Sequence, residues 1–391
     1  MRALVVAVCV AALSLGLPPG GTAEAKPPPI RIGALQNVTG SLGSIGAPSL
    51  AGARLAAEQL NGRGGVLGRR VKLVARDGHS DPSRVAAATR QLVRMPNLAA
   101  ITGLNDTAMA LAAAPVAERA RTVFVTSGAT SPLVPREFPR FYFMACFGDN
   151  AQAAAGAEYA HDALGARTAW LLSDDTTDYT ILLARYFKER YTQLGGKIVG
   201  EDTYAGGTTD FAAQIQRIRA LPSPPDMLYV SAGPDDIGPL VRQLRRAGIA
   251  EPIVGGDGYD TPLLLKEGGS GAHDVYFTTH AFLRPGQGTR RQRRFIAAYR
   301  AKFGAPPATA FAALGFDAVM LAADAIRRAG SARPTKVAAA LESTRGFRAV
   351  TGTISFGPGL HIPDKEVTIV KAGAGRLTLA AVRRPQRVPE P

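Results

Sequence analysis

The strongest constraint in this sequence is an alternation that begins at residue 30. Short runs rich in β-branched residues are followed by longer, alanine-rich amphipathic segments. Such alternation indicates β-α-β units, because each helix crosses over a sheet and returns the chain parallel to the preceding strand. In the first unit, IRIGAL (30–35) is predicted to be a strand, AGARLAAEQLN (51–61) a helix and RVKLVAR (70–76) the next strand. The sequence therefore predicts the α/β class with doubly wound parallel sheets.

The pattern runs in two series, which predicts two lobes. The first series contains about four strands before FPRFYFMACF (138–147), and the second runs from 150 to 256. Helical segments at 290–303, 311–328 and 336–343 follow without a full series of strands. They need an existing sheet to cover, so we expect the chain to return to the first lobe. With 391 residues, 46% of them hydrophobic, the chain has enough apolar material for two cores.

The first 25 residues have the features of a cleavable secretory signal peptide. An arginine precedes an apolar run that ends at Leu17, and an A-x-A site lies at 23–25. The run is too short for a membrane span, which needs about 20 apolar residues. The predicted parts are a signal peptide (1–25), a first lobe (26–147 and 281–350) and a second lobe (148–280 and 351–378), with a multi-crossover hinge joining the lobes. The basic, proline-rich tail (379–391) is expected to be disordered.

The net charge of +15 and the pI near 10.2 raise the question of a nucleic-acid partner. The densest basic run is RRQRR (290–294), but neither interleaved aromatic residues nor a nucleic-acid-binding motif accompanies it. Other arginines recur at helical spacing among alanines and leucines, which favours a solvated helix face. Removal of the signal peptide, which contains Cys9, leaves Cys146 as the sole cysteine, so no intramolecular disulfide is expected.

The glycine-rich stretch VTGSLGSIG (38–46) follows the first predicted strand, where nucleotide-binding proteins hold phosphate. Its glycines are spaced G-x-x-G-x-x-G and no Walker lysine follows, whereas a dinucleotide fingerprint begins G-x-G. The five histidines are scattered, and neither H-E-x-x-H, a cysteine pair nor G-x-S-x-G is present. We therefore predict no catalytic residue, metal or cofactor, although a catalytic triad on another spacing stays open.

Two loops that follow predicted strands offer small hydroxyl side chains, GLNDTAM (103–109) and VTSGATSP (125–132). In an open α/β sheet, ligands bind beyond the carboxyl ends of the strands, where these loops lie. Thr107 and Thr130 are thus candidate ligand contacts. A role as helix caps or turn formers is equally consistent with the local sequence.

Several segments together resemble one family. They are IRIGALQNVTGSLGSIG, GARLAAEQLNGRGGVLGRRV, DGHSDP, PVAERARTVFVTSGATSP and FAALGFDAVMLAADAI, in this order. With them the chain resembles, over roughly residues 30–375, the periplasmic solute-binding proteins of ABC transporters, of the branched-chain amino acid type typified by the leucine/isoleucine/valine-binding protein. The resemblance implies a type I periplasmic binding protein fold, whose two lobes, joined by three crossovers, close on a ligand like a clamp. VTGSLGSIG then lines the mouth of the cleft, and its glycines are expected to let backbone approach the ligand.

The resemblance also implies which residues contact an amino acid. The family's contacts to the ligand carboxylate fall at Thr107, the backbone of Gly128, and Thr130; hydroxyl and N–H groups at helix N-termini bind an anion without burying a cation. The acceptor for the α-ammonium falls at Asp257 in GGDGYD, and the second-lobe tyrosine falls at Tyr179 in DDTTDYT. If Asp257 faces inward it argues for a ligand with positive charge, since a buried lone carboxylate is costly. The alternative is an aspartate of a glycine-rich turn.

Three positions depart from the family pattern. Ile45 stands where the family's prototype has an aromatic residue, Thr180 replaces the glycine usual after the tyrosine, and Asp106-Thr107 replaces a serine pair. Asp106 brings negative charge near the expected carboxylate site, where it either weakens anion binding or caps the helix. These departures bear on the identity of the ligand more than on the fold.

We expect a soluble, monomeric periplasmic protein, without a nucleic-acid partner, that captures an amino acid by closure of its lobes. The ligand is expected to be branched-chain or otherwise aliphatic, and to pass to an ABC permease in the inner membrane. Within the binding class, the alternative is an aromatic or other organic acid that lacks an amine. A ligand sensor is a further alternative, disfavoured because no output domain is attached. An enzyme is disfavoured because no nucleophile, base and orienting group are recognisable together.

Overall fold

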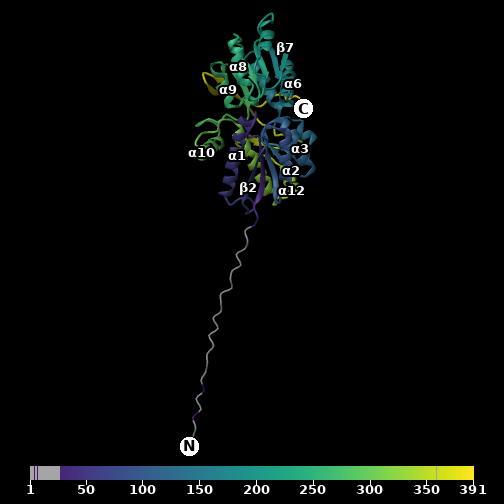
Figure 1. Cartoon of the computed structure of the whole chain (residues 1–391), viewed down its shortest axis with the longest axis vertical. Coiled ribbons are helices and arrows are strands. Elements are labelled where there is room, and N and C mark those ends of the chain that lie inside the picture. Colours follow the sequence, from purple (N-terminus) through teal and green to yellow (C-terminus); the bar gives the residue numbers. More distant parts are fainter. Residues whose placement is uncertain (1–3, 5–6, 8–26, 358) are drawn as a thin grey trace.

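The computed structural model describes residues 4, 7, 27–357 and 359–391, and it consists of two lobes stacked along the long axis of the molecule (Figure 1). Except for Leu4 and Ala7, the predicted signal peptide lies outside the described residues. Each lobe is built around a sheet, which agrees with the α/β class predicted from the sequence. No helix in the described part combines the length and the apolar character needed to cross a membrane.

The first lobe contains a five-stranded parallel sheet in the order β2-β1-β3-β4-β5. Its strands are β1 (Ile30–Gln36), β2 (Val71–Asp77), β3 (Leu98–Gly103), β4 (Phe124–Thr126) and β5 (Tyr142–Met144). Its connecting helices are α1 (Gly43–Asn61), α2 (Pro82–Val93), α3 (Thr107–Arg119) and α4 (Val134–Glu137). The central strand β1 is almost entirely buried, as expected for a strand covered on both faces. The sheet is doubly wound, because the chain adds β2 on one side of β1 and then β3 on the other.

The second lobe contains a seven-stranded sheet in the order β14-β13-β10-β9-β8-β6-β7. Its strands are β6 (Thr168–Asp174), β7 (Lys197–Tyr204), β8 (Met227–Ser231), β9 (Ile253–Gly255), β10 (Val275–Thr279), β13 (Val367–Gly373) and β14 (Arg376–Arg383). Its helices are α5 (Asp149–Asp162), α6 (Asp178–Gln193), α7 (Ala212–Arg219), α8 (Ile237–Arg246), α9 (Pro262–Gly268) and the 3-10 turns η1 (Asp257–Tyr259) and η2 (Gly269–Gly271). β6 to β10 are mutually parallel, whereas β13 and β14 extend one edge in antiparallel pairing.

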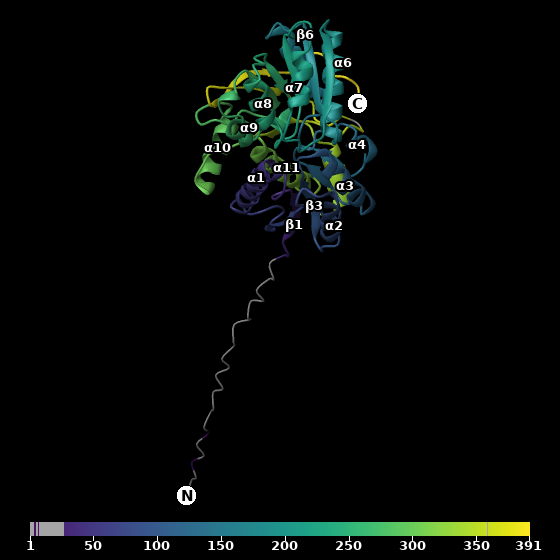
Figure 2. The same ribbon diagram turned by 45° about the horizontal axis from the view of Figure 1, so that its top comes forward.

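After β10 the chain returns to the first lobe, where α10 (Arg290–Phe303), α11 (Phe311–Arg328) and α12 (Pro334–Glu342) contribute to a core shared with α1 (Figure 2). α11 and α1 approach so closely that their backbones touch. A Cβ on Gly52 would lie 1.8 Å from the Ala312 carbonyl oxygen, and one on Gly315 would lie 2.0 Å from the Ser49 carbonyl oxygen. Glycine is therefore required at both positions of this helix pair.

The final crossover differs from the predicted boundary at residue 351. β11 (Phe347–Ala349) and β12 (Gly352–Ile354) form a two-stranded antiparallel sheet, and Ile354 and Phe356 are buried in the first-lobe core. The predicted boundary divides this hairpin, whereas the chain joins the second sheet only at β13. Strands of three residues leave too short a pattern for periodicity to reveal them.

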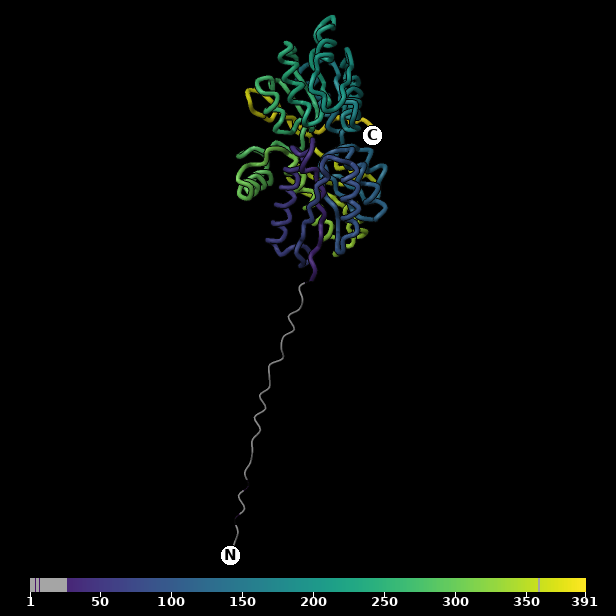
Figure 3. Tube along the Cα trace, in the orientation of Figure 1, coloured from purple at the N-terminus to yellow at the C-terminus, as the bar shows by residue number. Residues whose placement is uncertain are grey.

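The prediction that residues 379–391 are disordered is wrong. Residues up to Arg383 form β14, and the chain then follows α5 to the C-terminus, which lies beside the boundary of the two lobes (Figure 3). The backbone N–H of Gln386 donates to both carboxylate oxygens of Glu158 (3.0 Å each), and the Asn150 amide donates to the Pro389 carbonyl (2.9 Å). A basic, proline-rich composition predicts disorder for a segment in isolation, but it does not include the contacts that the segment makes with the rest of the fold. Here β13 and a buried carboxylate supply the partners.

Candidate ligand-binding site

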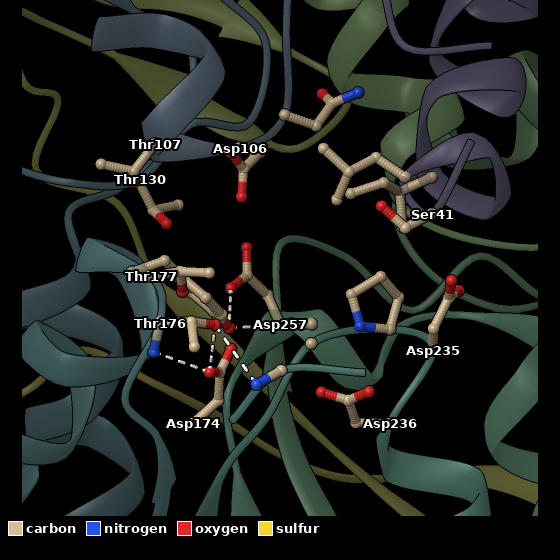
Figure 4. Close-up of a pocket in the computed structure, with 18 of the residues that line it drawn as sticks. Ser41, Asp106, Thr107, Thr130, Asp174, Thr176, Thr177, Asp235, Asp236 and Asp257 are labelled. Atoms are coloured by element: carbon tan, nitrogen blue, oxygen red, sulfur yellow. Dashed lines mark hydrogen bonds between the residues drawn. The ribbon is translucent and has the colours of Figure 1, made fainter. Parts of the chain in front are cut away.

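A cavity of about 310 Å³ lies between the lobes, lined by loops that follow strands of both sheets (Figure 4). This volume is near the lower end of the range of about 300–1,000 Å³ for small-molecule sites. Six of the seven predicted site residues line it: Ile45, Asp106, Thr107, Thr130, Tyr179 and Asp257. Residues that lie up to 212 positions apart, from Ile45 to Asp257, are thus brought together at one place where the parallel strands end.

The first-lobe wall presents a hydroxyl group that has no hydrogen-bond partner in the described part of the chain. Thr107 is the first residue of α3 and is 1% exposed, and its Oγ1 has no hydrogen-bond partner among the described residues. Thr130, which is 2% exposed, lies beside it in the cavity (Figure 4). A buried polar atom without a partner is costly, so a hydroxyl that faces a cavity at a helix N-terminus is suited to donate to an anionic group of a ligand.

Asp106 caps the helix that carries Thr107, which is one of the two roles that the sequence left open. Its backbone is extended and its Oδ1 accepts a hydrogen bond from the Met109 N–H (3.1 Å). The same side chain lines the cavity, and burial raises the pKa of its carboxyl above the ordinary value. A capping carboxylate next to the Thr107 hydroxyl therefore stabilises α3 while keeping negative charge at the edge of the site.

Gly128 does not line the cavity, contrary to the predicted backbone contact. Its N–H donates to the Leu104 carbonyl (3.1 Å) and is therefore already satisfied. A Cβ at this position would lie 2.9 Å from Asn105 Oδ1 and 2.9 Å from Phe311 Cε1, and both of those residues line the cavity. Glycine at 128 thus lets Asn105 and Phe311 take their places in the wall.

Asp257 faces the cavity (Figure 4), and hydrogen bonds hold both of its carboxylate oxygens. Its Oδ1 accepts from Tyr179 OH (2.9 Å) and from Gln152 Nε2 (2.9 Å), and its Oδ2 lies 3.0 Å from His280 Nε2. Burial lowers the pKa of His280, so the imidazole is neutral and its Nε2–H donates to the carboxylate. Tyr179 OH in turn accepts from the Gly258 N–H (2.9 Å). No lysine or arginine among the described residues forms an ion pair with Asp257, so its carboxylate is oriented by neutral donors and is open to a cationic group of a ligand.

Gln152 and His280, which the sequence analysis missed, complete this network. Gln152 Oε1 accepts from the Asp257 N–H (3.1 Å) and from Thr278 Oγ1 (2.7 Å), and its Nε2 also donates to Asp149 Oδ1 (2.9 Å). Burial, with a contribution from the charge of Asp257, raises the pKa of Asp149 to about 8. His280 directly follows β10, so the position of that strand's end was the one available signal for it.

The stretch VTGSLGSIG lines the cavity as predicted, but not through its glycines. α1 begins at Gly43, inside the stretch, rather than near residue 51, and Leu42 and Ile45 line the cavity with their side chains. Gly46 does not line it; a Cβ there would lie 1.8 Å from the Asn37 carbonyl oxygen. The glycine therefore packs α1 against the end of β1 rather than admitting a ligand to the backbone.

The second-lobe wall contributes three further acids that the sequence analysis did not select: Asp174, Asp235 and Asp236. Asp174 ends β6, and the other two follow β8 in the loop GPDD (233–236). The same rule that directed attention to the hydroxyl loops, position after a parallel strand, also applies to these residues.

A family model described as a periplasmic binding protein matches residues 29–376. The chain belongs to this family of periplasmic binding proteins. It is accordingly a solute-binding protein and not an enzyme, as the sequence analysis expected.

Curated relatives and solved structures agree with this membership. The Leu/Ile/Val-binding protein homolog 3 of Brucella melitensis is 26% identical over 358 residues, 91% of this chain and 95% of that protein. An amino acid binding protein of Pseudomonas aeruginosa is 30% identical over 231 residues, but this match covers only 59% of the chain and 61% of that protein's length.

Among solved structures, the leucine binding protein LivK of Thermotoga maritima superposes with a TM-score of 0.84 and is 31% identical, covering 91% of this chain and 99% of that one. The substrate-binding protein LivJ of Streptococcus pneumoniae, solved with isoleucine, has a TM-score of 0.85 and is 29% identical, covering 91% and 100%. These comparisons confirm the two-lobed fold and the resemblance to branched-chain amino acid binding proteins.

Proposed function

We propose that this periplasmic binding protein captures an amino acid in the cavity between its lobes and delivers it to an ABC permease. One observation carries the proposal. One lobe presents a group suited to an anion, and the other lobe presents a group suited to a cation. The unpartnered Thr107 hydroxyl at the start of α3 suits a carboxylate, and the oriented carboxylate of Asp257 suits an ammonium group. A zwitterion bound to both would draw the lobes together, which is the clamp motion of binding proteins.

The side chain of the ligand is proposed to be aliphatic. Leu42, Ile45 and Phe311 give the cavity an apolar surface beside its polar groups. Several relatives are named for leucine, isoleucine and valine, and the LivJ structure holds isoleucine. Both facts favour an aliphatic side chain over an aromatic one.

The proposed location and partner of the protein are those of the same family. The proposed location is the periplasm, reached through the signal peptide, and the proposed partner is the permease of an ABC transporter. The basic run at 290–294 is exposed at the start of α10, while Phe295 and Ile296 of the same helix are buried in the first-lobe core. That arrangement supports a solvated helix face, so we propose a monomer without a nucleic-acid partner.

A thermal-shift measurement tests the function. Because a ligand that binds only the folded state raises the melting temperature, L-leucine, L-isoleucine and L-valine should each raise it. The matched probe is 4-methylpentanoate, which is leucine without its amine and should have little effect, since it cannot engage Asp257. A larger shift with 4-methylpentanoate than with leucine would replace the amino acid by an amine-free acid as the ligand. No shift with any amino acid would refute the proposal.

A further inference from the structure

The second-lobe wall holds more negative charge than an amino acid with a neutral side chain requires. Asp174, Asp235 and Asp236 line the cavity together with Asp257 and Asp106. Among the described residues that line this cavity, none is lysine or arginine, although the whole chain carries a net charge of +15. Five carboxyl groups around one small cavity in a basic protein call for a physical reason, since like charges at close range repel.

Helix capping and loop structure do not account for all of these acids. Asp236 stands at the N-cap of α8 but makes no capping hydrogen bond, and its Oδ1 accepts instead from the Gly207 N–H (3.1 Å). Asp174 uses one oxygen, Oδ1, to accept from the N–H (2.8 Å) and the hydroxyl (2.5 Å) of Thr176. Within the described chain, no lysine, arginine or histidine forms an ion pair with Asp174, Asp235 or Asp236. Asp174 Oδ2 therefore has no hydrogen-bond partner among the described residues, and Asp236 has, besides the Gly207 N–H, only the neighbouring Tyr204 hydroxyl.

The energetic consequence of this clustering is visible at Asp236. Burial, together with the charges of Asp174 and Asp235, raises the pKa of Asp236 to about 6. Clustering of these carboxylates is therefore unfavourable, and a cation bound among them would offset that cost, because an opposite charge within about 4–6 Å favours the ionised form.

An independent observation on the opposite lobe also fits a ligand site in this cavity. Thr107 Oγ1, buried on the opposite lobe, has no partner among the described residues. In Figure 4, Thr107 and Thr130 lie on one side of Asp257, and Asp235 and Asp236 lie on the other. A ligand that reaches from the hydroxyl groups past Asp257 arrives at the second-lobe acids with its far end.

We propose that the cavity prefers an amino acid whose aliphatic side chain carries a terminal cation over one with the same carbon stem and no cation. This inference rests on the proposed function, in which Thr107 and Asp257 hold the α-carboxylate and α-ammonium groups. The aliphatic stem lies along Leu42 and Ile45, and the terminal cation pairs with Asp236 and its acidic neighbours.

L-lysine and L-norleucine form the decisive pair of probes, because they share a linear four-carbon stem and differ in the ε-ammonium group. Titration calorimetry at pH 7.5 should give a Kd for lysine at least tenfold lower than that for norleucine, because only the ε-ammonium group can form charged hydrogen bonds with the acids; tenfold corresponds to about 1.4 kcal/mol. Asp236→Asn should reduce this ratio about tenfold or more. Asp235→Asn, at an exposed position without a hydrogen bond, gives a second variant in which folding is not at stake and should reduce the ratio as well. Asp175→Asn is the matched control, because this exposed neighbour does not line the cavity.

The outcomes separate the two proposals. Norleucine binding as tightly as lysine, or an unchanged ratio in both folded variants, would overturn the preference for a cation and leave the amino acid function intact. Absence of binding by lysine, norleucine and leucine alike would overturn the proposed function itself. Cadaverine, which is lysine without its carboxylate, should bind at least tenfold more weakly than lysine; equal binding would show that the site selects a diamine and would overturn the assignment of Thr107 to a carboxylate.

Discussion

Replacement of Asp257 by asparagine is the perturbation whose effect is best defined by the structure. The change removes one negative charge and almost no volume. The asparagine Oδ1 can still accept from Tyr179 OH and Gln152 Nε2, which now lie 2.9 Å from Asp257 Oδ1. The asparagine amide can donate to His280 Nε2 once the imidazole proton moves to Nδ1. That tautomer breaks no other hydrogen bond, because His280 Nδ1 has no partner among the described residues.

Binding and stability should therefore respond differently to this change. Loss of a charged acceptor for the ligand ammonium should weaken binding by about 1.5–3 kcal/mol, which corresponds to a Kd roughly 10- to 150-fold higher. The free energy of unfolding without ligand should change by no more than about 1 kcal/mol, because the protein-protein hydrogen bonds are retained. Calorimetry with L-leucine and L-lysine measures the first quantity, and denaturant unfolding followed by circular dichroism measures the second.

Two results would refute this reasoning. A folded Asp257→Asn protein with unchanged affinity for both amino acids would show that the carboxylate does not contact the ammonium group. A variant that fails to fold would show that the carboxylate is chiefly a structural element of the second lobe. Asp175→Asn, which removes the same charge from an exposed neighbour of the cavity, should change neither quantity.

Three further predictions concern the site and the lobes. Thr107→Val should raise the Kd for L-leucine about tenfold without lowering the melting temperature, because the Thr107 hydroxyl has no hydrogen-bond partner among the described residues. Thr107→Ser keeps the hydroxyl and should bind L-leucine nearly normally. Equal calorimetric titrations of the two variants would contradict the assignment. The pKa of Asp149 is raised to about 8 from an ordinary value near 4, so the folded state binds this proton more tightly than the unfolded state does. The free energy of unfolding should therefore fall as pH rises from about 4 to 8, by at most about 1.4 kcal/mol per pH unit. Asp149→Asn should flatten this pH dependence, and an unchanged slope in urea unfolding series would contradict the burial argument. Gly52→Ala should destabilise the protein by about 1–3 kcal/mol or more, because its Cβ would lie 1.8 Å from a carbonyl oxygen of α11, whereas Gly62→Ala, with its nearest atom at 3.5 Å, should be nearly neutral; equal melting temperatures would refute the close contact.

Position along the chain was enough to predict much of the site, because one rule connects sequence to space in parallel α/β sheets. The carboxyl ends of the strands meet at one edge, so residues that follow strands meet there too. Thr107 and Thr130 were selected on this basis, and Ile45, Tyr179 and Asp257 by the family resemblance, and all of them line one cavity. Whether each contacts a ligand stays a prediction for the experiments above.

The same rule could have selected the acids of the second lobe. Asp174 and the GPDD loop follow strands as clearly as the hydroxyl loops do, but a pair of aspartates in a loop is common and carries no distinctive motif. Only the structure shows that these side chains face one cavity whose described lining includes no lysine or arginine.

What the sequence determined by itself was local. Hydrophobic periodicity defined most strands and helices. Capping chemistry is equally local: at the start of α2, Asp81 accepts a hydrogen bond from the Arg84 N–H, and Pro82 follows it. These properties arise between residues a few positions apart, so they can be read without knowledge of the fold.

What only the tertiary structure decided was the identity of partners that are distant along the chain. Gln152 donates to a carboxylate 105 residues away, and the Asn150 amide holds the C-terminal segment 239 residues away. The choice of glycine at 128 and at 52 likewise depends on which backbone or side chain packs against it. Such contacts are fixed by packing and by the need to satisfy buried polar groups, and neither leaves a periodic signal in the sequence.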